Sequence, residues 1–166
     1  MQQLLRRTLE VPVHERGENF VIGSWRSLFV MYWIGGPSLH ALDRMEHHED
    51  ALLRRHPEGI TSLFVIREIR ITRPPTGEVK RRADELASKY FPHLVGTAQV
   101  VDGSGFSASM ARTFLTAVTL FGRSQAPTKV FGDIGSATRW IGRLPSQDAG
   151  IAERAGELEG AVSAMV

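Results

Sequence analysis

Apolar runs alternate with turns along the chain, in a pattern that predicts a mixed α/β fold. Two runs rich in aromatic and β-branched residues, Phe20–Trp25 and Leu28–Ile34, lie so close together that they predict neighbouring antiparallel strands. Two further runs, Ile60–Ile66 and Leu94–Val101, have the length and branching of buried strands. The short run Thr128–Phe131 predicts a last strand.

Helices are predicted between these strands by apolar residues that recur at helical spacing. Ser38 is a suitable N-cap for a first helix that runs to about Arg55, and Thr76 can cap a second helix after Pro74 and Pro75. Ser136 is expected to cap a last core helix that continues to Leu144. The expected inner faces consist of Leu39, Leu42, Met45, Leu52 and Leu53 in the first helix, Val79, Ala83, Leu86 and Tyr90 in the second, and Ala137, Trp140 and Ile141 in the last.

The centre of the predicted fold is the stretch Leu94–Gly122. Its strand is followed by a glycine turn, Asp102–Gly105, and then by a segment that is apolar around most of a helical circumference. A helix of that kind is typical of a buried core element, with Phe114 in its middle.

Strands that are joined through helices run parallel, because a tight turn cannot return the chain in the same direction. The expected fold class is therefore α/β, with a mixed sheet of about five strands that starts antiparallel and has amphipathic helices packed against it. Residues 1–19 are expected to form an N-terminal arm with a short strand at Thr8–Val13, residues 20–144 the domain, and residues 145–166 a helical tail.

Composition limits the functional classes. The chain has 166 residues, 42% of them hydrophobic, which suffices for one domain with a full core. It contains no cysteine, so disulfides and thiolate sites are excluded. A formal charge of +2 from interspersed acids and bases argues against a nucleic-acid-binding protein. Neither a secretory signal nor a membrane-spanning run is visible, so a cytoplasmic protein is expected.

The order of elements resembles the STAS domain, the fold of bacterial anti-sigma-factor antagonists, and most closely the STAS-like branch that is grouped with CRAL-TRIO lipid-transfer domains. The resemblance covers residues from about Phe20 to Leu144 and is carried by Ile34-Gly35-Gly36, Ile60–Ile66, Val95–Val101, and the ending Lys129-Val130-Phe131-Gly132-Asp133 with Ala137 and Trp140-Ile141. It implies a non-catalytic regulatory module that binds proteins, whereas the kinship with CRAL-TRIO domains implies a carrier or sensor of a small lipid or nucleotide.

The phosphorylation motif of the family is missing. Typical members carry Asp-Ser-Ser/Ala-Gly at the start of the helix after the third strand, and a kinase phosphorylates the serine. Here the corresponding residues are Arg73-Pro74-Pro75-Thr76-Gly77, in which only a hydroxyl and a glycine match. Phosphate on Thr76 would suit a helix N-terminus beside Lys80 and Arg81, although a plain N-cap explains the same threonine.

A second candidate site is the glycine turn. Gly103, Ser104 and Gly105 belong to a G-x-G-x-x-A pattern between strand and helix, where small residues and free N–H groups can bind a nucleotide or another anion. However, the pattern comes late in the fold, and Asp133 lies further away than the acid of a dinucleotide fingerprint. A glycine turn with a serine N-cap is the simpler interpretation.

Two clusters of polar residues are further candidates for a site. Helical spacing puts Asp43, His47 and Asp50 on one face, but His40 is too distant and no H-x-x-x-H pair occurs, so we expect a solvated face and no metal or other cofactor. The basic residues Arg67, Arg70, Arg73, Lys80, Arg81, Arg82 and Lys89 could meet an acidic partner, but interleaved acids favour a solvated surface. No constellation for nucleophilic catalysis is visible, so an enzyme is not expected.

Self-association is also expected. The tail Gln147–Val166 has an apolar side but contains helix-weakening glycines, so burial is needed to order it. The second strand offers Phe29, Tyr32 and Trp33, more apolar surface than one sheet face needs. A homodimer would cover both surfaces, and a tail that folds back on its own domain is the alternative.

Overall fold

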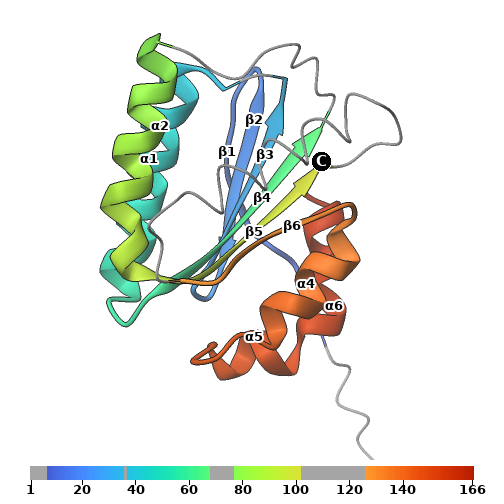
Figure 1. Ribbon diagram of the computed structural model, residues 1–166. Coiled ribbons are helices and arrows are strands. Elements are labelled where there is room, and N and C mark those ends of the chain that lie inside the picture. Colours follow the sequence, from blue (N-terminus) through green and yellow to red (C-terminus); the bar gives the residue numbers. More distant parts are fainter. Residues whose placement is uncertain (1–6, 36, 68–76, 102–125) are drawn as a thin grey trace, which may run out of the picture.

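The computed structural model describes residues 7–35, 37–67, 77–101 and 126–166. A mixed sheet of six strands, ordered β1-β2-β3-β4-β5-β6 as in the sequence, forms the centre of the molecule (Figure 1). The strands are β1 (Val13–Arg16), β2 (Phe20–Trp25), β3 (Leu28–Ile34), β4 (Ile60–Arg67), β5 (Leu94–Val101) and β6 (Thr128–Phe131). The first three strands pair antiparallel, and β3 to β6 pair parallel. The predicted α/β class is confirmed.

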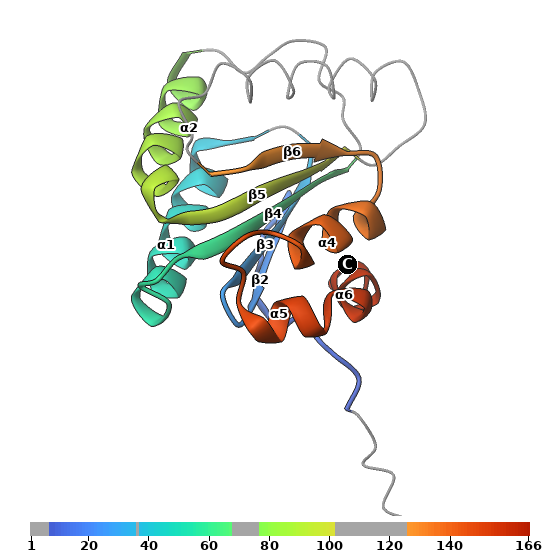
Figure 2. The same cartoon turned by 60° about the horizontal axis from the view of Figure 1, so that its bottom comes forward.

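Helices cover both faces of this sheet (Figure 2). One face carries α1 (Leu39–Arg55) and α2 (Gly77–Tyr90), and a single 3₁₀ turn, η1 (Phe91–His93), leads from α2 into β5. The other face carries α4 (Ile134–Gly142), α5 (Ala149–Glu153) and α6 (Ala155–Ser163). The expected core helix around Phe114 lies outside the described residues. No helix in the described ranges is long and apolar enough to cross a membrane.

Two hydrophobic cores follow from the alternation of side chains along the strands. Under α1 and α2, alternate residues of β2 and β3 pack with the apolar stripe of α1 and the inner side of α2, and Phe20, Phe29 and Met31 among them are at most 1% exposed. On the opposite face, Val30, Tyr32 and Leu63 are among the residues that pack against α4, α5 and α6. Both faces of the sheet are therefore filled by side chains of this chain.

The sheet has one strand more than expected. The predicted arm contributes β1, which pairs with β2, and the short strand expected at Thr8–Val13 instead lies at Val13–Arg16. Leu9 and Val11 are nevertheless buried in the core under α6. A bulge between Val13 and Glu15 and the charged composition of β1 are typical of a protected edge strand.

The helix caps match the prediction in one place and differ in another. Ser38 caps α1, since its hydroxyl accepts a hydrogen bond from the Ala41 N–H at 3.2 Å. The predicted Ser136 cap is wrong: α4 begins three residues earlier, and Asp133 accepts from the Ser136 N–H at 2.7 Å. A carboxylate is the stronger acceptor, and it also suits the positive end of the helix dipole.

The tail folds back on its own domain as two helices. Ile151, Leu158, Val162 and Met165 are each at most 2% exposed, all against the face of the sheet that carries α4. The aromatic residues of β3, which also motivated a dimer, are buried within the same chain. Both apolar surfaces are therefore covered without a second copy, and the homodimer stays a prediction.

Candidate functional site

The carboxyl ends of parallel strands are the usual place for a ligand site in an α/β sheet. The predicted site residues come directly after such strands in the sequence: Thr76 after β4, and Gly103, Ser104 and Gly105 after β5. All four lie outside the described residues. The described part of this edge includes Arg67 at the end of β4 and Asp133 after β6.

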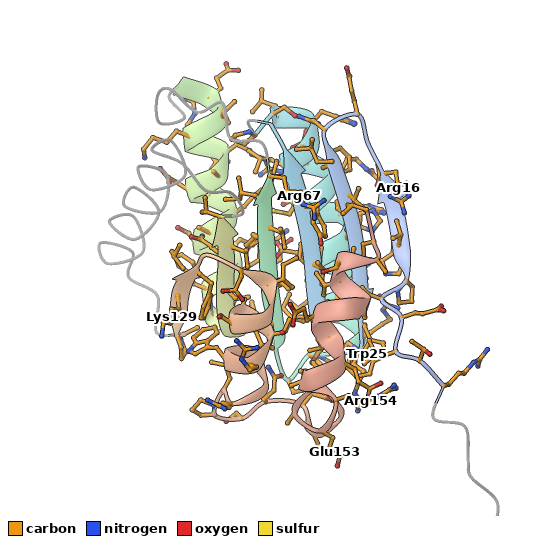
Figure 3. All side chains as sticks on the ribbon, turned by 90° about the vertical axis from the view of Figure 1, so that its right-hand side faces the viewer. Arg16, Trp25, Arg67, Lys129, Glu153 and Arg154 are labelled. Carbon is orange, nitrogen blue, oxygen red and sulfur yellow. The ribbon has the colours of Figure 1, made fainter. Side chains whose placement is uncertain are left out.

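Arg67 lies on the face of the sheet that carries α4 and α6 (Figure 3). Its guanidinium carbon is 5.2 Å from the centre of the Tyr32 ring, a distance at which cation and aromatic ring attract each other. The Tyr32 hydroxyl donates a hydrogen bond to the Val162 carbonyl at 2.9 Å, so the ring is fixed by α6. The end of β4 and the C-terminal helix are thus connected through Tyr32.

Asp133 has a structural role at this edge. Its carboxylate accepts hydrogen bonds from both the backbone N–H and the hydroxyl of Ser136, at 2.7 and 2.8 Å. The backbone hydrogen bond is the main reason why its pKa is lowered. Both contacts serve the N-terminus of α4, so Asp133 acts as a helix cap.

The predicted basic cluster does not stay together: Arg67 lies on the face that carries α4 and α6, Arg70 and Arg73 lie outside the described residues, and the remaining members lie on two sides of α2. Lys80 and Arg81 are exposed on the outer side of α2, where they line a solvent-open hollow of about 590 Å³ together with Asp84, Glu85 and Ser88. Lys80 forms an ion pair with Asp84 at 2.5 Å. Arg82 and Lys89, by contrast, point toward α1.

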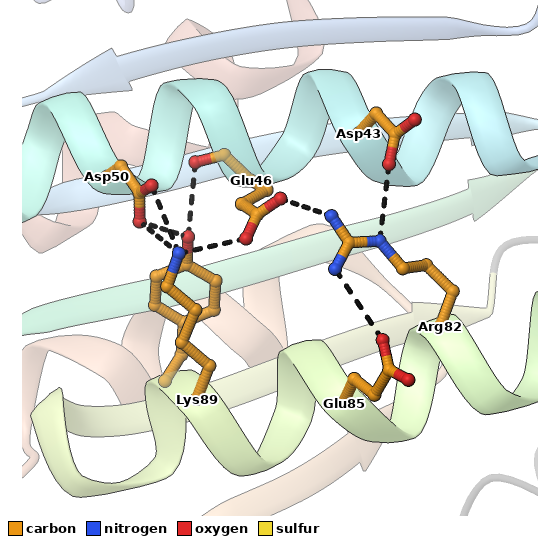
Figure 4. Close-up of polar contacts among 7 residues, drawn as sticks. Asp43, Glu46, Asp50, Arg82, Glu85 and Lys89 are labelled. Carbon is orange, nitrogen blue, oxygen red and sulfur yellow. Dashed lines mark hydrogen bonds and ion pairs between the residues drawn. The ribbon is translucent and has the colours of Figure 1, made fainter.

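Arg82 and Lys89 connect α2 to the acidic side of α1, which we call the acidic flank and define by Asp43, Glu46 and Asp50 (Figure 4). Arg82 bonds both to Glu46 and to Asp43, the latter at 3.2 Å. Lys89 Nζ lies 2.9 Å from Glu46 Oε1 and 3.0 Å from Asp50 Oδ1. Three carboxylates of one helix are thus each paired with at least one of two cations of its neighbour.

Tyr90 extends this network into the core. Its hydroxyl donates to Asp50 at 2.5 Å and lies 3.1 Å from the Glu46 carbonyl, while the residue is only 3% exposed. Burial and the contact with Asp50 both raise the pKa of the tyrosine. Burial alone would raise the pKa of Asp50, but the hydrogen bonds from Tyr90 and Lys89 outweigh it and lower that pKa.

The predicted grouping of Asp43, His47 and Asp50 is therefore resolved into separate contacts. Asp43 and Asp50 face α2, whereas His47 is exposed and its ring meets the His48 ring edge-on at 5.1 Å. Within the described ranges, no three histidine, aspartate or glutamate side chains are placed to share a metal ion. A solvated face was predicted from the sequence, but Asp43 and Asp50 instead form ion pairs with α2.

The opposite side of α1 faces β1. We call the contact between them the histidine flank and define it by Arg44 and His48 of α1 and by His14 and Glu15 of β1. The Arg44 Nε donates to both oxygens of Glu15 at 3.0 Å, and His48 Nε2 lies 2.7 Å from Glu15 Oε2. The hydrogen bond from Arg44 is the main reason why the pKa of Glu15 is lowered. These contacts join the edge strand to the helix.

His14 occupies the middle of this flank. Its Nε2 is 2.6 Å from the Ser24 hydroxyl, and its ring stacks on that of His48 with 6.0 Å between the centroids. Burial lowers the pKa of His14, and the nearby His48 and Arg55 lower it further. Ser24 is only 7% exposed and Glu15 bonds to His48, so the Ser24–His14 pair lacks both the access and the bonded carboxylate of a catalytic triad.

Polar groups also lie inside the core under α1. The register pairs Ser62 of β4 with Thr97 of β5, so both side chains point to the same face of the sheet. Ser62 bonds to the buried carboxyl of Glu49, whereas Thr97 Oγ1 and Gln99 Oε1 are buried with no hydrogen-bond partner among the described residues. Buried polar atoms without partners are rare in proteins and require a physical explanation.

Glu49 and the histidine flank were not among the residues predicted from the sequence to form a site. A signal for Glu49 was present, because Leu42, Met45, Glu49 and Leu52 follow one another at helical spacing on a single stripe. His14 and Ser24 carry no such signal, since their contact depends on the pairing of β1 with β2.

Comparison with known proteins yields no match: none of the family models, curated proteins or solved structures matches the chain. The candidate sites therefore depend on their own geometry.

Proposed function

We propose that this chain is a non-catalytic, STAS-like regulatory module that acts by binding another protein. The observation that carries this proposal is the filling of both sheet faces: Phe29 and Met31 on one side and Tyr32 and Leu63 on the other are at most 1% exposed. In a domain whose layers are packed in this way, a partner would bind at the outer surface.

The surface available for such a partner is polar. In the described ranges, the exposed large hydrophobic side chains are Leu39 and Val166, at 39% and 44% exposure. They belong to α1 and to the C-terminus, so they do not form one apolar patch. A partner would accordingly be recognised through charged and hydrogen-bonding groups, which give specificity and association rate more than buried area. A cytoplasmic location and a homodimeric state belong to the same proposal.

A second candidate function, a small-ligand sensor, is supported by one specific observation. Thr97 is 6% exposed, and within the described part of the chain neither its hydroxyl nor the buried Gln99 Oε1 on the same strand has a hydrogen-bond partner. A polar ligand, or a bound water, would satisfy both groups. These residues belong to β5, which leads in sequence to Gly103–Gly105.

Native mass spectrometry of the full chain, purified under mild conditions from its own cells, separates the two functions. A regulatory module gives the mass of the chain alone, 18.4 kDa or a multiple of it, together with complexes of a reproducible partner. A sensor instead gives an added small mass that is released on denaturation. Loss of that mass in Thr97→Val, but not in Thr61→Val on the other face, would replace the regulatory proposal with the sensor.

A further inference from the structure

Glu49 is an acid in a place where acids are rarely found. Of the described acids and bases it alone is fully buried, with 2% of its surface exposed. It lies on the inner side of α1 between Met45 and Leu52, which are themselves buried in the core under the helix. An ionised carboxylate in such surroundings is costly unless a cation is bound to it.

The described groups around Glu49 do not supply that cation. The Ser62 hydroxyl donates to Glu49 Oε1 at 3.2 Å and is itself 1% exposed. Of the charged and titratable groups that face Glu49, Glu46 and Asp50 belong to α1, and Lys89 and Tyr90 belong to α2. Lys89 is already shared by Glu46 and Asp50, at 2.9 and 3.0 Å.

The balance of these effects favours the neutral acid. Burial is the main cause that raises the pKa of Glu49 to about 8, and the nearby Asp50 and Glu46 raise it further. The hydrogen bond from Ser62 and the charge of Lys89 act in the opposite direction but do not compensate. Near neutral pH, the buried carboxyl therefore keeps its proton.

We propose that Glu49 makes the docking of α1 on the sheet sensitive to pH: the helix packs with Glu49 as a neutral acid and detaches more readily as the pH rises. When α1 detaches, Glu49 reaches water and its proton passes to the solvent. Because both flanks of the helix depend on its position, detachment also breaks the contacts of α1 with α2 and β1. Loss of the Glu49 proton is thus coupled to the packing of α1 against the sheet, α2 and β1.

The direction of this pH dependence follows from the coupling between proton binding and folding. A group whose pKa is raised in the folded state contributes stability that is fully present below its unfolded pKa and is lost as pH rises through the folded pKa. For Glu49 that window extends from about 4.5 to about 8. Within it, opening of α1 becomes up to about tenfold more frequent per pH unit, and above it the change levels off.

Hydrogen exchange of α1 peptides tests this proposal. After correction for the intrinsic pH dependence of exchange, the protection of Leu39–Arg55 should fall more than about tenfold between pH 6 and pH 8 in the wild type. Glu49→Gln keeps the size of the side chain but removes the titrating proton, so its protection should not depend on pH in this way. Glu46→Gln, on the acidic flank of the same helix, is the matched control and should retain the pH dependence.

Two results would overturn the proposal: α1 protection in the wild type that does not change between pH 6 and pH 8, or the same pH dependence in Glu49→Gln. Should Glu49→Gln fail to fold, carbon-13 NMR of the wild-type glutamate carboxyl carbons decides. One glutamate titrating near pH 8 supports the proposal, whereas titration of all glutamates below about pH 6 contradicts it.

Discussion

The two sides of α1 are held by different chemistry. On the acidic flank, Glu46 and Asp50 meet the permanent charges of Arg82 and Lys89. On the histidine flank, the helix meets β1 through His48, His14 and Glu15, and burial lowers the pKa of His14 below its usual value of 6.5. A single helix is thus fixed on one side by pairs that resist mild changes of pH and on the other side by a contact that responds to them.

The largest effect is expected at the centre of the acidic flank. Glu46 bonds to both Arg82 and Lys89, and hydrogen bonds from Lys89 are the main cause of its lowered pKa. Glu46→Ala should lower the free energy of unfolding by about 1–2 kcal/mol, because it leaves both cations short of a partner. Chemical denaturation at pH 7 and low salt measures this loss.

A matched control is provided by Glu58, which lies beyond the end of α1 and whose side chain is 70% exposed. Glu58→Ala should change the free energy of unfolding by less than about 0.5 kcal/mol. High salt screens the exposed parts of the acidic flank, so the difference between the two variants should shrink there. Equal stability of the two variants at low salt would show that the acidic flank does not hold α1.

The contrast between the flanks also shows what the sequence can predict. Strands such as Phe20–Trp25 and Thr128–Phe131 agree with the prediction residue by residue, because apolar runs and turns are local signals. The same local view could not separate Asp43, His47 and Asp50, which share a helix but face different neighbours. Which neighbour a side chain meets depends on contacts between residues far apart in the chain, such as Glu46 with Lys89.

The cap of α4 and the edge strand β1 show the same limit of prediction from local sequence. Asp133 and Ser136 are both good cap residues, and only the observed start of α4 selects the aspartate. The strand β1 is short and charged, so it lacks the apolar run by which the other strands were predicted, and its pairing with β2 forms the sixth strand. The predicted sites at Thr76 and Gly103–Gly105 lie outside the described residues and stay predictions.

A smaller effect is expected where the acidic flank enters the core. Tyr90→Phe removes the hydroxyl that donates to Asp50 but keeps the buried ring. The free energy of unfolding should fall by about 1 kcal/mol, since one hydrogen bond to a charged group is lost and Asp50 still has Lys89. Thermal unfolding measures the change. A variant as stable as the wild type would mean that Lys89 alone suffices for Asp50.

The smallest effect at neutral pH, and the most selective one, is expected on the histidine flank. Burial, His48 and Arg55 lower the pKa of His14, so the folded state takes up a proton on this ring less readily than the unfolded chain does. The stability that neutral His14 contributes is therefore present above pH 6.5, its pKa in the unfolded chain. This contribution is lost as the pH falls through the lower pKa of the folded state. The lowered pKa of Glu15 acts in the same direction at more acidic pH.

His14→Gln tests this flank because glutamine can still bond to Ser24 but cannot take up a proton. At pH 7.5 the variant should differ from the wild type by less than about 0.5 kcal/mol. At pH 5.5, hydrogen exchange in β1 should be faster in the wild type than in the variant, whereas exchange in β4 should be the same in both. Acid would then loosen β1 while a rise in pH loosens α1, so the edge strand and the helix would respond to pH in opposite directions. Identical exchange of β1 in both proteins at pH 5.5 would remove His14 from this comparison and leave Glu15 with Arg44 as the contact that fixes the edge strand.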